Sequence, residues 1–158
     1  MERRLFLGGL AACAASPLLA HARPAGWGDV DTAHPWYLAG RVTAARWSAP
    51  HVELLIAPDP ALSLPADLRA WSLPAQRAQV DGAALLARTR LPTRDATEWT
   101  LVLASARLLH AWRIPRIAPG ERVAVVGYPL RQDDPPPLLR VEYLFHADRA
   151  YALRSPPS

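Results

Sequence analysis

Apolar and polar residues alternate over several short stretches of this chain, and prolines, glycines and small polar residues separate those stretches. The first alternation lies within 38–47 and the second within 51–57, with Ser48-Ala49-Pro50 between them. Alternation with a period of two predicts half-buried strands, and proline cannot donate to a sheet ladder. We therefore expect two strands with a bend at Pro50.

The middle and the end of the chain predict further strands. Residues 98–103 alternate branched and aromatic side chains, the pattern that strands favour. Residues 122–127 alternate around Val123 and Val125, and 138–145 and 151–154 flank an Ala147-Asp148-Arg149 turn. A short turn between two such runs indicates a hairpin. About six strands are expected in all.

One short helix is expected between these strands. Ser105 can cap its first turn, Leu108, Leu109 and Trp112 share one face, and Pro115 with Pro119-Gly120 ends it. Residues 58–74 contain four prolines and predict a loop or a short helical excursion. In 79–90, Asp81-Gly82 beside an apolar run is consistent with a turn into a strand, and a helix fits as well.

This order of elements is typical of a small, partly open β-barrel of the oligonucleotide/oligosaccharide-binding type, with five to six strands and one short helix. The length fits one such domain. We expect it to span 36–154 with an insertion near 58–97. A flexible arm, 23–35, would precede it and a tail, 155–158, would follow it.

The N-terminus has the pattern of a signal peptide over 1–22. Arg3-Arg4 precedes an apolar, small-residue stretch that ends in Ala20-His21-Ala22, the A-x-A form of a cleavage site, so cleavage after Ala22 is expected. The paired arginines resemble a twin-arginine export signal, although a general secretory leader also carries arginine. A periplasmic or secreted protein is predicted. The alternative is a lipoprotein anchored through Cys13, since Leu10-Ala11-Ala12-Cys13 has the spelling of a lipobox.

Composition narrows the function only slightly. The hydrophobic fraction of 51% and the charged fraction of 20% are typical of a packed domain. All 18 basic residues are arginine and the formal net charge is +4, a usage that fits a GC-rich genome better than a nucleic-acid surface. Cys13, in the leader, is the single cysteine, so no disulfide is expected in the mature domain. No later apolar run is long enough to span a bilayer, so the domain should be soluble.

Three motifs resemble those of a known family. They are Gly40-Arg41-Val42 followed by Trp47-Ser48-Ala49-Pro50-His51, then Trp99-Thr100-Leu101, and then Pro119-Gly120-Glu121-Arg122-Val123-Ala124-Val125-Val126-Gly127-Tyr128. The chain thereby resembles small exported bacterial proteins of domain-of-unknown-function family 6152. The resemblance implies a leader and a β-barrel-like domain, and no activity. Ala49 replaces the asparagine that the family has before Pro-His, and 58–97 is longer than the usual connection.

Among candidate site residues, His51 stands out because an imidazole at the start of a strand can bind a metal or a ligand. The alternative is a purely structural role, in which the His51 side chain hydrogen-bonds the bent backbone. A copper or zinc site would need three or four ligands, which His34, His110 and His146 could supply only through the fold. Asp133-Asp134, followed by prolines, indicates a solvated loop.

These observations favour a binding or accessory domain for a small ligand or a periplasmic protein partner. The sequence has neither a G-x-S-x-G nucleophile motif nor a glycine-rich phosphate loop after a strand. The alternatives are metal handling through His51 and, as the weakest, nucleic-acid binding on exposed tryptophans. The patterns around Trp47, Trp99 and Trp112 instead indicate core packing.

Overall fold

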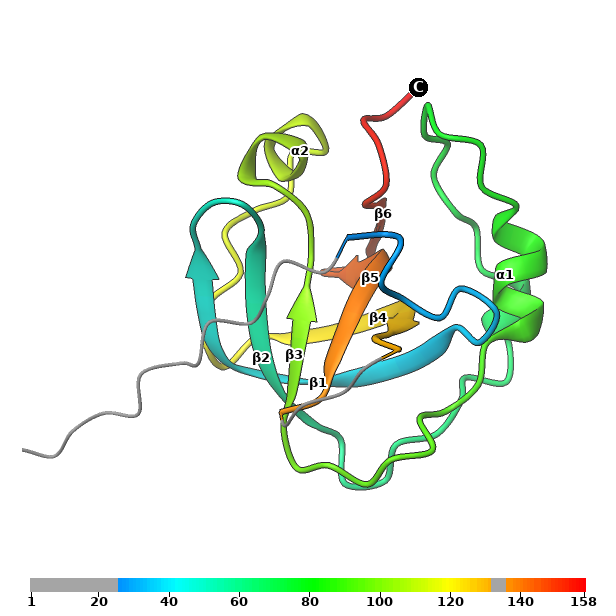
Figure 1. The fold of residues 1–158 in the computed structure, drawn as a ribbon, viewed down its shortest axis with the longest axis vertical. Coiled ribbons are helices and arrows are strands. Elements are labelled where there is room, and N and C mark those ends of the chain that lie inside the picture. The colour runs from blue at the N-terminus through cyan, green and yellow to red at the C-terminus, as the bar shows by residue number, and fades with distance from the viewer. Residues whose placement is uncertain (1–25, 132–135) are drawn as a thin grey trace, which may run out of the picture.

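In the part of the chain that the structure describes, the domain contains six strands and three short helical segments. Figure 1 labels the strands and the two α-helices. The structure is a computed structural model that describes residues 26–131 and 136–158. Its elements, in chain order, are β1 (Trp36–Trp47), β2 (Val52–Pro58), the 3-10 helix η1 (Leu68–Ala70), α1 (Gly82–Arg88), β3 (Trp99–Val102), α2 (Ala106–Ala111), β4 (Arg122–Pro129), β5 (Leu138–His146) and β6 (Arg149–Ala152).

Five of the strands close into a barrel. β1 pairs antiparallel with β2 and with β4, β2 pairs with β3, and β4 pairs with β5. β3 then runs parallel to β5, with Thr100 opposite Leu138, and completes the circle. β6 adds to the free length of β5. The predicted fold class, a small β-barrel of five to six strands with one short helix, is confirmed, and the barrel is closed where the sequence predicted a partly open one.

Two glycines of the motifs quoted above are required where strands approach closely. A Cβ atom on Gly40 would lie 2.2 Å from the carbonyl oxygen of Ala57, and one on Gly127 would lie 2.3 Å from that of Arg140. No side chain fits at such distances, so β1 and β4 can bend around the barrel only with glycine at these positions.

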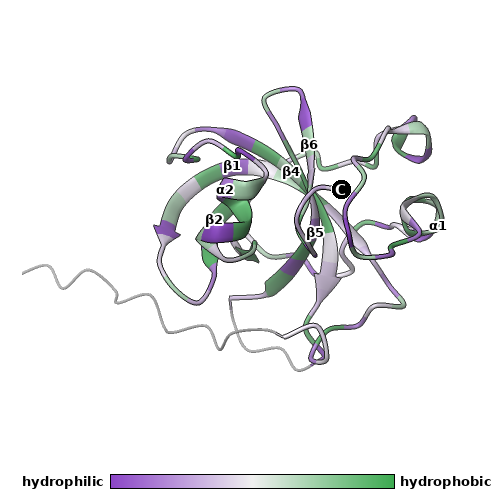
Figure 2. Cartoon of the chain, turned by 90° about the horizontal axis from the view of Figure 1, so that it is seen from above, coloured by the Kyte–Doolittle hydropathy of each residue, from purple (hydrophilic) through white to green (hydrophobic). Residues whose placement is uncertain are grey.

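The interior of the barrel is a closely packed apolar core. Its members include Leu38, Leu54, Trp99, Leu101 and Val125, all at most 1% exposed. α2 lies over one end of the barrel (Figures 1 and 2), and its Leu109 belongs to the same core. Ser105 caps this helix as predicted, because its Oγ accepts from the N–H of Leu108 at 3.3 Å. The predicted burial of Trp99 is confirmed, while Trp47 and Trp112 pack against the core and stay partly exposed.

A second apolar layer covers the outside of the barrel. The insertion predicted at 58–97 folds back over β1, β4 and β5, and its Leu68, Leu85 and Leu86 pack against Tyr37 and Tyr128. Figure 2 shows α1 outside the ring of strands. The ambiguous segment 79–90 therefore forms a helix, and a strand there was the wrong alternative. Asp81 caps this helix by accepting from the N–H of Ala84 at 2.9 Å.

Both ends of the described chain pack on the barrel. Val30 is fully buried, and backbone hydrogen bonds join Asp31 to Pro129 and Arg131 to Asp29. Residues 26–35 are thus part of the packed domain and not the free arm that the sequence predicted. The tail is held too, since the N–H of Ala78 donates to Ser155 Oγ at 2.7 Å and Gln76 forms a bridge with Pro157.

Burial of the outer-layer tyrosines predicts a loss of stability in alkali. Burial, and then the negative charge of Glu142, raises the pKa of Tyr128 from 10.0 to about 12, and burial also raises the pKa of Tyr37 and Tyr143. A raised folded-state pKa gives stability that is complete below pH 10 and disappears as the pH rises toward 12. We expect the urea midpoint to fall over this range. Tyr128→Phe, which has no hydroxyl, should reduce the fall; an unchanged fall would contradict the assignment.

Candidate functional site

A groove of about 660 Å³ opens on the outside of the barrel, between the insertion and the β5–β6 hairpin. β1 contributes Tyr37, the end of η1 contributes Trp71, β4 contributes Arg122, and the hairpin contributes Phe145 through Ala150. The hairpin turn has two residues with positive φ, Ala147 at 50° and Asp148 at 60°. Such a turn fits the twist of the two strands and fixes the position of the side chains beside it.

Aromatic side chains form the apolar part of this groove. The rings of Trp71 and Phe145 meet edge to face, with centroids 4.7 Å apart, and Tyr37 meets Trp71 in the same manner at 6.3 Å. Tyr37 is buried, whereas Trp71 and Phe145 are half-buried and present part of their surface. Three segments far apart in the sequence thus build one aromatic surface, and a flat or apolar group could stack on it.

Charged side chains surround the aromatic surface. Both terminal nitrogens of Arg122 donate to Asp59, at 2.9 and 2.6 Å, so this guanidinium is held in place. Arg149 and Asp148 are exposed at the hairpin. His146 is buried and its Nε2 lies 3.1 Å from Glu121 Oε1. The hydrogen bond that Glu121 accepts from the backbone N–H of Ala118, together with His146, lowers the pKa of Glu121.

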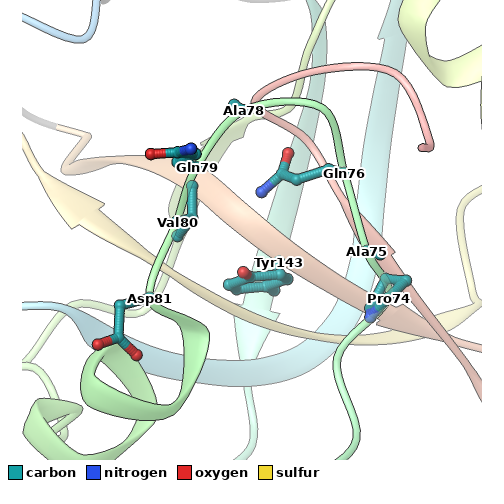
Figure 3. Close-up of a pocket in the computed structure, with 8 residues that line it drawn as sticks. All are labelled: Pro74, Ala75, Gln76, Ala78, Gln79, Val80, Asp81 and Tyr143. Atoms are coloured by element: carbon teal, nitrogen blue, oxygen red, sulfur yellow. The ribbon is translucent and has the colours of Figure 1, made fainter.

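A second, smaller pocket of about 470 Å³ lies under the loop 74–81, with Tyr143 at its base (Figure 3). Polar side chains of this pocket form hydrogen bonds within the protein. Gln76 donates to Glu142 Oε1 at 3.5 Å and accepts from the N–H of Ser155 at 3.0 Å, while Asp81 caps α1. These bonds explain how the insertion is held. They occupy the side chains of Gln76 and Asp81, which line this pocket.

Next to this pocket, a buried carboxylate and two arginines gather around Trp27. Glu142 is completely buried and accepts from Arg154 Nε at 3.0 Å and from Arg154 Nη2 at 2.5 Å. The guanidinium carbons of Arg140 and Arg154 lie 4.7 and 4.3 Å from the centre of a Trp27 ring. Arg140 is 5% exposed, and this burial lowers its pKa to about 10. Arg140 therefore stays charged at neutral pH.

The structure places the four predicted histidines in separate surroundings. His51 precedes β2, and its buried Nδ1 has no hydrogen-bond partner among the described residues, so the predicted bond to the bent backbone is absent. Burial, and then the charge of Arg140, lowers the pKa of His51. His34 pairs with Asp31 at 2.8 Å, and His110 is exposed on α2. Only His146 of the four lines the groove.

These histidines do not build a metal centre. Within 26–131 and 136–158, no three His, Cys, Asp or Glu side chains lie close enough to hold a metal ion, so the predicted copper or zinc set of His51, His34, His110 and His146 is not assembled. Cys13, Ala20, Ala22 and the pair Asp133-Asp134 lie outside the described residues.

Sequence reasoning missed the groove and the buried Arg140. Trp71 lies in an insertion without a period and Phe145 in a predicted strand, and nothing in the pattern brings them together. The burial of Arg140 depends on Trp27, more than a hundred residues earlier in the chain. The one signal in the sequence was its six tryptophans, and the patterns around three of them indicated core packing.

Comparison with known proteins gave no relative: no family model, no curated protein and no solved structure matches this chain. In the described part of the chain, every helix is too short to cross a membrane.

Proposed function

We propose that this chain is an exported periplasmic binding or accessory domain that holds its ligand in the groove between Trp71 and the β5–β6 hairpin. The observation that carries the proposal is the groove itself, with its aromatic surface and charged surroundings. Small-molecule sites typically have volumes of about 300–1,000 Å³, apolar walls and a few placed polar groups. The mouths and outer faces of small barrels are common places for them.

The chemistry of the groove favours a ligand with a flat or apolar part and an acidic group. Trp71 and Phe145 offer ring surface for stacking, and Arg149 lies beside them with its charge in solvent. Arginine binds carboxylates and phosphates through its planar fork of donors. The fixed Arg122–Asp59 pair at one edge would reject a ligand that placed an apolar group there.

Anilinonaphthalene sulfonate, an aromatic sulfonate, is a suitable probe because it has both features. We expect its fluorescence to rise saturably with one molecule bound per chain, and Trp71→Ala to weaken binding about tenfold or more, the equivalent of ~1.4 kcal/mol. Arg149→Ala should weaken it less, since its charge is screened by solvent.

Leu64→Ala provides the control for this experiment. Leu64 is an exposed apolar residue, at 40%, that does not line the groove, so its loss should leave the binding unchanged. Circular dichroism must show that the variants are folded, because loosened proteins also bind this dye. Equal binding by Trp71→Ala and wild type would refute the groove as the site.

Export is part of the same proposal. It rests on the leader pattern of 1–22 and on motifs that resemble those of small exported proteins of domain-of-unknown-function family 6152. Mass spectrometry of the protein recovered from the periplasm is expected to give Arg23 as the first residue. A lipid-modified Cys13 would instead place the protein on a membrane.

A further inference from the structure

The outer face of β2, β3 and β5 brings three polar side chains near one another. Val52, Leu139 and Val141 point into the barrel core, so their neighbours His51, Glu53 and Arg140 lie on the outer face. Glu53 pairs with Val102 of β3, and Val102 pairs with Arg140 of β5, so the three form one row across the sheet. His51 lies two positions before Glu53 on the same side.

Two of these side chains have buried polar atoms without a partner. Among the described residues, no acceptor lies within hydrogen-bond distance of Arg140 Nε or Nη1, and His51 Nδ1 is unpaired as well. Buried polar groups in folded proteins are nearly always hydrogen-bonded, and a buried donor without an acceptor is costly. The ring of Trp27 offsets part of the charge of Arg140 but accepts neither of these two N–H bonds.

The local charges do not cancel. Glu53 pairs with Arg46, and Glu142 pairs with Arg154, so both nearby carboxylates already have an arginine of their own. Among the described residues, Arg140 thus has no carboxylate paired with it, although the charge of Glu142 acts on it. One bound anion would neutralise Arg140 and accept from one of these N–H groups, because Nε–H and Nη1–H point from different edges of the guanidinium.

We propose that Arg140 and His51 form an oxyanion site, specific for a carboxylate or phosphate group, beneath Trp27. Trp27 is half-buried and lies three residues before the anchored Val30, at the start of the described chain. Its ring covers Arg140, so the anion enters when the indole moves aside. This site is separate from the groove beside Trp71, and each can be tested without the other.

The test measures the thermal unfolding of the exported protein in inorganic phosphate, in acetate and in chloride at constant ionic strength. A specific anion raises the melting temperature saturably, because it binds the folded state only. We expect a saturable rise with phosphate or acetate in wild type and in the control Arg107→Met, which removes an exposed arginine on α2. Arg140→Met should abolish the rise. A lower half-saturation concentration for phosphate would identify a phosphate group as the natural anion, and a lower one for acetate would identify a carboxylate.

Two further variants cover the case in which Arg140→Met does not fold. Trp27→Ala should lower the half-saturation concentration severalfold, because the cover is gone, and His51→Ala should raise it severalfold. If Arg140 has only a structural role, no variant should show a saturable effect of an anion on the melting temperature. That result, or an equal effect in wild type and Arg140→Met, would overturn the proposal.

Discussion

Trp99→Ala is expected to lower the free energy of unfolding by about 3–5 kcal/mol, the usual cost of deleting a large buried aromatic side chain. Trp99 is 1% exposed and lies on β3, the strand that closes the barrel. Its ring meets that of Trp36 edge to face, with centroids 5.7 Å apart. Alanine would leave a cavity in the centre of the core, and the surrounding strands, paired on both sides, could not collapse to fill it.

Urea denaturation of the two proteins measures this difference. Leu64→Ala, which truncates an exposed leucine, should change stability by no more than about 0.5 kcal/mol and serves as the control. A loss below ~1 kcal/mol for Trp99→Ala would mean that the side chain is accessible. The alternative function, nucleic-acid binding on exposed tryptophans, would then gain support.

Arg154→Met is expected to cost about 3–5 kcal/mol, because it leaves a buried charge without its partner. Glu142 is 0% exposed and accepts three hydrogen bonds from Arg154. The remaining partner, Gln76, is 3.5 Å away and neutral. Loss of the pair should also loosen the C-terminal tail and the loop 74–81, which meet at the same place.

The matched control makes the same substitution in an exposed pair. Arg122 also binds a carboxylate through two nitrogens, but its side chain is 58% exposed, so Arg122→Met should cost less than about 1 kcal/mol. Adding Glu142→Gln to Arg154→Met removes the unpaired charge and should recover part of the loss. Similar losses for Arg154→Met and Arg122→Met would show that Glu142 is not isolated from water.

The strands were predictable from the sequence because each produces a local pattern. Alternation around Val123 and Val125, and the branched residues of 98–103, reflect a strand with one face in the core. The helix α1 was ambiguous because its seven residues are too few for a helical period to differ from an apolar strand. The docking of 26–35 depends on a single buried side chain, Val30, which forms no pattern at all.

The candidate site was less predictable because its parts become neighbours only in three dimensions. Of the four histidines chosen from the sequence, His146 lines the groove and His51 lies on the same outer face as Arg140, while Trp71 and Arg140 gave no local signal. A polar residue in a strand usually faces solvent. Arg140 does not, because Trp27 covers it, and no pattern near residue 140 indicates a cover from residue 27.

The parallel pairing of β3 with β5 also has a consequence for how the protein reaches its native state. Thr100 must meet Leu138, and β1 must meet β4 some eighty residues along the chain, before the barrel can close. Such distant pairings require long loops to close first, which slows folding into the millisecond-to-second range typical of β-domains. A fragment that stops before residue 138 would therefore have an open sheet edge, a hazard for aggregation while synthesis is incomplete.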